Sequence, residues 1–129
     1  MLIQRRSDEI REILLDDTTI ATAAITPIEV ASALWRQRLS GRLLLDAHQR
    51  AEATFAELSR RWIEIAFSPA VVETALRLVT RHSLRSLDAI QLASAMVLTA
   101  TPHTLPFVTL DKRLIAAADA EGFPILPRP

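Results

Sequence analysis

The chain contains no cysteine, and few of its residues are aromatic. The lack of cysteine excludes disulfide bonds, thiolate metal sites and cysteine nucleophiles, and it suits a reducing cytosol. Aromatic residues make up 5% of the chain whereas 50% is hydrophobic, so we expect a core built mainly from Ala, Leu, Ile and Val. With 129 residues the chain fits one domain, which we expect to span residues 1–129.

Net charge and long apolar runs are also absent. Fifteen basic residues balance fifteen acidic ones, so the chain lacks the broad positive charge of many nucleic-acid binders. Any contact with nucleic acid must therefore be local. No apolar run approaches the roughly 20 residues of a membrane helix, and no signal-peptide pattern is present. We expect a soluble, cytoplasmic protein that does not engage a membrane.

Periodicity predicts helices that alternate with short strands. Short apolar segments, several of them β-branched, predict strands at residues 19–26, 61–67, 106–110 and 123–127. Apolar residues at spacings of three and four, together with cap signals, predict helices at 7–17, 26–39 and 44–58, from Ser68 through Val79, from Asp88 to before Pro102, and at 111–122. This alternation indicates an α/β domain with a mainly parallel sheet.

Two of these helices carry apolar stripes that predict which face is buried. One stripe consists of Val72, Ala75, Leu76 and Val79. The other consists of Leu87, Ile90, Ala93, Met96 and Val97. We expect both stripes to face the core.

Three carboxylates stand at the ends of predicted elements, and each has a structural explanation as well as a chemical one. Thr26 and Glu29 have the spacing of a capping box, and Asp88 and Asp111 can each cap the helix that they begin. Glu29 and Asp111 also follow predicted parallel strands, whose carboxyl ends meet at one edge of a sheet. Spacing leaves open whether Asp88 reaches the same edge.

Convergence of the three carboxylates would require a cation. Their mutual repulsion and desolvation would be costly without one, and Mg²⁺ or Mn²⁺ prefers such an oxygen-rich site. A hard cation of this kind can activate water and neutralise charge on a phosphoryl group. Phosphodiester hydrolysis is the chemistry that such a site suits.

The sequence resembles the PIN-domain nucleases, in particular the VapC-type toxins of toxin–antitoxin pairs. Three blocks carry the resemblance: "ATAAITPIEVASALWR" with Glu29, "HSLRSLDAIQLASAM" with Asp88, and "FVTLDKRLIAAADAEGFPIL" with Asp111. The resemblance implies a three-layer PIN-like α/β domain, with a mainly parallel central sheet flanked by helices. It also implies a metal-dependent endoribonuclease in which Glu29, Asp88 and Asp111 bind Mg²⁺ or Mn²⁺. Thr109 matches a position that is often polar in the family, and would orient the ligands.

The sequence departs from the family pattern at its start. Family members begin with a short apolar strand that ends in an Asp, and "MLIQRR" contains no acidic residue for that role. The strand is central in the family's sheet, so its absence removes a metal ligand and backbone partners for its neighbours. A start codon placed too late, a truncated product, or a strand supplied by another chain would each account for it.

The resemblance also implies partners: an RNA substrate, a cognate antitoxin and a second copy in a homodimer. Arg85, Lys112 and Arg113 flank two of the carboxylates and can bind phosphates, although the neutral net charge favours their being ordinary solvated helix ends. Apolar residues of the early helices, such as Trp35, belong either to the core or to an antitoxin groove. The three histidines lack metal-ligand spacing. An alternative function is an inactive PIN-like module that binds an antitoxin or self-associates.

Overall fold

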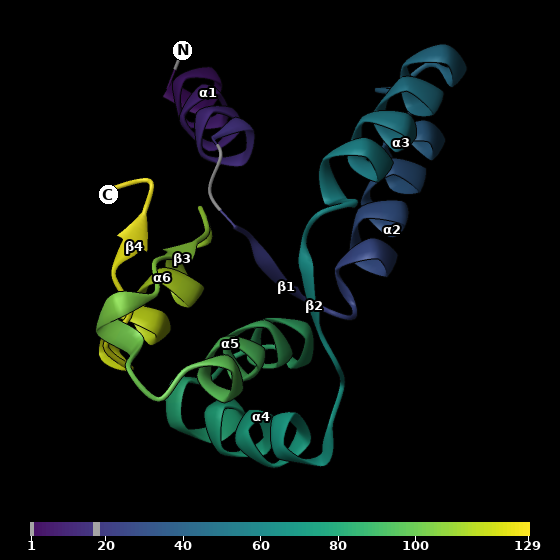
Figure 1. Ribbon diagram of the computed structural model, residues 1–129. Coiled ribbons are helices and arrows are strands. Elements are labelled where there is room, and N and C mark those ends of the chain that lie inside the picture. Colours follow the sequence, from purple (N-terminus) through teal and green to yellow (C-terminus); the bar gives the residue numbers. More distant parts are fainter. Residues whose placement is uncertain (1, 17–18) are drawn as a thin grey trace.

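The computed structural model describes residues 2–16 and 19–129, and it shows helices joined to very short strands (Figure 1). In chain order the elements are α1 (Leu2–Leu15), β1 (Ala21–Ala23), α2 (Thr26–Leu39), α3 (Leu45–Ser59), β2 (Ile63–Ile65), α4 (Pro69–His82), α5 (Ser86–Leu98), the 3₁₀ helix η1 (Pro102–Thr104), β3 (Phe107–Val108), α6 (Lys112–Ala120) and β4 (Ile125–Leu126). The α/β alternation expected from the sequence is confirmed.

The strands form two parallel pairs. Ala21, Thr22 and Ala23 of β1 lie opposite Ile63, Glu64 and Ile65 of β2. Phe107 and Val108 of β3 lie opposite Ile125 and Leu126 of β4. The expected parallel pairing is confirmed, but in the described part of the chain the strands make two separate two-stranded sheets instead of one continuous sheet.

The core lies around the packed pair α4 and α5. Val71 and Leu78 of α4 and Leu92 of α5 are almost fully buried, and the small residues Ala89 and Ala93 let the two helices approach closely. α6 and the turn after it extend this core through Leu114, Ala117, Ala118 and Phe123, and Ile125 of β4 packs against it. Figure 1 shows α2 and α3 side by side and projecting away from α4 and α5.

The buried faces of α4 and α5 differ from the expected stripes. α4 buries Val71, Thr74, Ala75 and Leu78, whereas Leu76 is 67% exposed. Val71, Ala75 and Leu78 each precede one of Val72, Leu76 and Val79. α4 therefore has two adjacent apolar stripes with the same spacing, and the stripe with Val71 and Leu78 faces the core. α5 buries Ala89, Leu92, Ala93, Ser94 and Ala95, because its alanine face permits the closest contact with α4. Leu87 and Val97, expected inside, are exposed.

Several element boundaries follow from local chemistry. The Ser68 hydroxyl accepts a hydrogen bond from the N–H of Val71 at 3.2 Å, so Ser68 caps α4 as expected. Gly122 has a φ of 96° and follows Glu121, the C-cap of α6, as expected for a residue that ends a helix. α1, however, begins at Leu2, so Ser7 lies inside it and is not its cap; the residues before Ser7 continue the helix. The expected end at Asp17 lies outside the described residues.

β1 and β3 each have a free edge. The N–H of Ile63 donates to the carbonyl of Ile20 at 2.8 Å and the N–H of Ala24 donates to that of Ile65 at 3.0 Å. Alternate residues of a parallel strand bond to the same neighbour, so the N–H groups of Ala21 and Ala23 point away from β2. In the described part of the chain neither N–H has a hydrogen-bond partner, although Ala23 is only 2% exposed.

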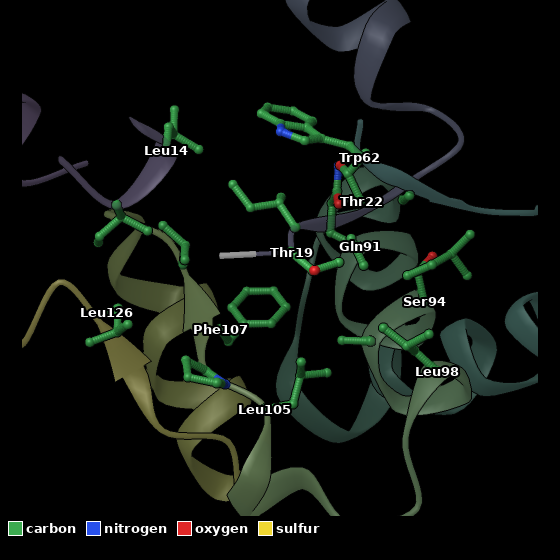
Figure 2. A pocket seen from close by; sticks show the side chains of 18 of the residues that line it. Leu14, Thr19, Thr22, Trp62, Gln91, Ser94, Leu98, Leu105, Phe107 and Leu126 are labelled. Carbon is green, nitrogen blue, oxygen red and sulfur yellow. The ribbon is translucent and has the colours of Figure 1, made fainter. Parts of the chain in front are cut away.

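The free edges of β1 and β3 border the same apolar groove. The N–H groups of Phe107 and Thr109 donate to β4 and the turn before it, so Val108 directs its N–H away from β4. The groove has a volume of about 390 Å³ and is lined by both strands, by α5 and by the end of α1. Figure 2 shows Leu105 and Phe107 on one side of it and Ser94 and Leu98 of α5 on another.

Within the described ranges, no helix has the length and apolar character to cross a membrane.

Candidate active site

Asp111 lies at the N-cap of α6, as the sequence predicts. Its carboxylate accepts a hydrogen bond from the N–H of Leu114 at 3.0 Å, and its own N–H donates to the hydroxyl of Thr109 at 3.1 Å. Thr109 therefore fixes the backbone of Asp111, while α6 fixes one carboxylate oxygen. The side chain remains exposed, so its second oxygen is accessible to a ligand.

Asp88 lies in the first turn of α5 but does not cap that helix. α5 begins at Ser86 with Arg85 at the N-cap, and no side-chain hydrogen bond forms at that cap. The expectation that Asp88 is a cap was wrong because the N-cap lies at Arg85, ahead of the residue that the sequence pattern indicates. Among the described residues, no hydrogen bond or ion pair engages the Asp88 carboxylate.

The pKa of Asp88 is raised above its ordinary value. Partial burial is the largest cause, the negative charge of Asp111 is the next, and the nearby charge of Arg85 partly opposes both. A carboxylate that repels a second one and lacks a local partner is the electrostatic pattern of a functional site. The fold thus brings Asp88 and Asp111 together although 23 positions separate them in sequence.

Asp88 and Asp111 share a pocket with basic side chains. The pocket has a volume of about 450 Å³ and is lined by Arg85, Asp88, Leu110, Asp111, Lys112 and Arg113. Three cations next to two carboxylates give the local positive charge that the neutral chain as a whole lacks. Such a pocket can hold a cation between the carboxylates and an anionic group against the basic side chains.

Glu29 is not part of this pocket. The Gln91 amide nitrogen lies 2.5 Å from Oε1 of Glu29 and 3.0 Å from the hydroxyl of Thr26, which in turn lies 2.6 Å from the hydroxyl of Thr22. The capping-box expectation for Glu29 was wrong. α2 begins at Thr26, with Ile25 at the N-cap and no side-chain cap bond, so the Glu29 carboxylate is left to bond with α5.

The three candidate carboxylates therefore do not form one cluster. Asp88 and Asp111 interact, whereas Glu29 is tied to Gln91 on the next turn of α5. In the described ranges no group of three or more His, Asp or Glu side chains is arranged to hold a metal ion. Two carboxylates nevertheless fit Mg²⁺, which is commonly bound by one or two of them and keeps several waters.

Sequence reasoning missed the role of Gln91 as the partner of Glu29. The available signal was a polar residue inside the apolar run "AIQLASAM", three residues after Asp88 and so on the same helix face. Two of the three histidines pair with a single glutamate each: His48 Nε2 lies 2.8 Å from Glu52 Oε1, and His82 Nε2 lies 3.4 Å from Glu121 Oε1.

The architecture is that of an α/β protein with a paired-carboxylate pocket flanked by basic side chains. The sequence model of the PIN domain matches residues 3–120, so the chain belongs to the PIN-domain family. Members of this family are generally metal-dependent nucleases, which agrees with the paired aspartates. A search of curated proteins finds none that matches the chain.

The interaction between the two aspartates predicts a change in titration. Asp111→Asn removes the negative charge that helps to raise the pKa of Asp88, so we expect that pKa to fall toward its ordinary value. The pKa is measured by NMR titration of the Asp88 side-chain carboxyl carbon in both proteins. An unchanged value in the variant would show that the two side chains do not interact.

Proposed function

We propose that the chain is a Mg²⁺- or Mn²⁺-dependent endoribonuclease and the toxin of a VapBC-type toxin–antitoxin pair. The observation that carries this proposal is the pairing of Asp88 with Asp111 in a pocket that also contains Arg85, Lys112 and Arg113. Membership of the PIN-domain family supports the nuclease chemistry, and the three sequence blocks described above support the VapC-type assignment.

Each side chain of the pocket has a defined part in this proposal. Asp88 and Asp111 hold the cation, and their repulsion is relieved when it binds. The bound cation supplies charge neutralisation and water activation. Arg85, Lys112 and Arg113 bind the RNA backbone, because three basic groups at one rim attract successive phosphates. Glu29 of α2 supports the site from beside it, where Gln91 of α5 holds its carboxylate.

The proposal predicts RNA cleavage that depends on a divalent ion. Purified protein incubated with a labelled single-stranded RNA is expected to cut it internally when Mn²⁺ or Mg²⁺ is present in excess over the protein. EDTA is expected to stop the reaction, and excess Mn²⁺ to restore it. Cleavage that continues unchanged in EDTA would contradict the mechanism.

The alternative function, an inactive PIN-like binding module, would give no cleavage under any metal condition. Two features favour a binding role in addition to catalysis. α2 and α3 contain no buried residue in the described structure, and Trp35 on α2 is 55% exposed. We propose that this α2–α3 hairpin receives an amphipathic antitoxin helix, and that a homodimer uses a different apolar face. Binding of the antitoxin without nuclease activity would select the alternative.

We also propose that the groove between β1 and β3 accommodates an additional strand. The free N–H groups of Ala21, Ala23 and Val108 border that groove, and its walls are mainly apolar. An extended apolar segment would satisfy these donors and cover the walls at the same time. In this proposal the added strand takes the place of the short apolar strand with which members of the family begin.

A further inference from the structure

Gln91 connects the first turn of α2 to the helix that carries Asp88. An ionised carboxylate can only accept hydrogen bonds, so the amide nitrogen of Gln91, and not its oxygen, must face Glu29. That nitrogen has two N–H groups, and both have an acceptor: Oε1 of Glu29 at 2.5 Å and Oγ1 of Thr26 at 3.0 Å. The amide of Gln91 is therefore fully used as a donor to α2.

These contacts are well placed to determine where the Glu29 side chain lies. α2 has no buried residue, so apolar packing gives its first turn little anchorage. The polar chain from Thr22 through Thr26 to Gln91 supplies an anchor instead, with spacings of 2.6 and 3.0 Å. The contact with Gln91 occupies Oε1 of Glu29 and leaves Oε2 for another group.

Gln91 also lies close to Asp88 along α5. It follows Asp88 by three residues on α5, so the two side chains share one helix face about 4.5 Å apart along the axis. A group held by Gln91 is therefore held next to Asp88. A Mg²⁺ ion bound by two carboxylates keeps several waters, and a carboxylate held next to Asp88 can accept hydrogen bonds from them.

We propose that Gln91 is a positioning residue: its amide fixes the Glu29 carboxylate one helical turn from the Asp88–Asp111 pair, and Glu29 supports cation binding there only in that position. This inference rests on the proposed function, because it assumes that the aspartate pair binds a divalent ion. It adds a residue that has no ligating role of its own. Outer partners of this kind typically change metal affinity by about 10–100-fold.

Mn²⁺ binding to the purified full chain tests the inference, by calorimetry and by the EPR signal of free Mn²⁺. Gln91→Met keeps the size of the side chain but removes both donors, and it is expected to raise the dissociation constant about tenfold. Gln91→Asn keeps the polarity but shortens the reach, and it is expected to act in the same direction. Gln37→Met, the same substitution at an exposed position of α2, is the matched control and is expected to bind as the wild type does.

A double-mutant cycle with Glu29→Gln separates positioning from a general structural effect. If Gln91 acts through Glu29, then Gln91→Met will not weaken Mn²⁺ binding further in the Glu29→Gln background. An additive loss, or wild-type affinity in both Gln91 variants, would overturn the inference. Absence of Mn²⁺ binding by the wild type would instead overturn the proposed function, and this inference with it.

Discussion

Asp88→Asn is expected to reduce metal-dependent RNA cleavage by about a thousandfold, which corresponds to roughly 4 kcal/mol of transition-state stabilisation. The substitution keeps the shape of the side chain but removes one of the two negative charges that hold the cation. Cleavage of a labelled RNA at saturating wild-type Mn²⁺ measures the loss. Raising the Mn²⁺ concentration is expected to recover part of the activity, because the Asp111 carboxylate remains.

The same substitution is expected to leave the fold at least as stable. The pKa of Asp88 is raised in the folded chain, so its ionised form costs stability above about pH 4, and below both the folded and unfolded pKa values the cost disappears. The Asn variant should therefore gain thermal stability relative to the wild type as the pH rises, and not lose it. Asp119→Asn, on the exposed side of α6, is the matched control and should retain full cleavage. Equal activity in both variants would remove Asp88 from the site.

Phe123→Ala is expected to lower the free energy of unfolding by about 3–5 kcal/mol. Phe123 is 2% exposed, and its ring centroid lies 5.9 Å from that of Phe107, so its removal opens a cavity where β3, β4 and α6 meet. A domain stabilised by roughly 5–15 kcal/mol would lose a large share of that stability. Urea unfolding followed by circular dichroism measures the change.

Phe67→Ala provides the comparison for this prediction. Phe67 is 56% exposed and precedes the cap residue of α4, so the same loss of ring atoms should cost no more than about 0.5 kcal/mol. Similar losses in the two variants would mean that burial of Phe123 in the core does not determine the effect.

The order of elements was predictable from the sequence because each boundary has its own local signal. Ser68 with Pro69 begins α4, Gly122 follows α6, and Asp111 caps α6, and each of these acts within a few residues. The buried faces of α4 and α5 were not predictable in the same way. Both helices have apolar residues on more than one face, and only the contact between them selects the face that is buried.

The candidate site was predictable in part for a similar reason. The three sequence blocks pointed to Glu29, Asp88 and Asp111, and the structure brings the two aspartates together. Caps were misassigned for Glu29 and Asp88 because the N-cap residues are Ile25 in α2 and Arg85 in α5, and not Thr26 and Asp88. The bond between Glu29 and Gln91 joins residues 62 positions apart, so only the tertiary structure reveals it.

The free edge of β1 has a consequence for the behaviour of the protein in concentrated solution. A strand with outward N–H groups is a template on which an extended segment of any neighbouring molecule can pair. Ala21 and Ala23 offer no charged or proline side chain that would block such a contact. We therefore expect self-association to increase with concentration, and we expect an apolar peptide that occupies the edge to act as a solubilising additive.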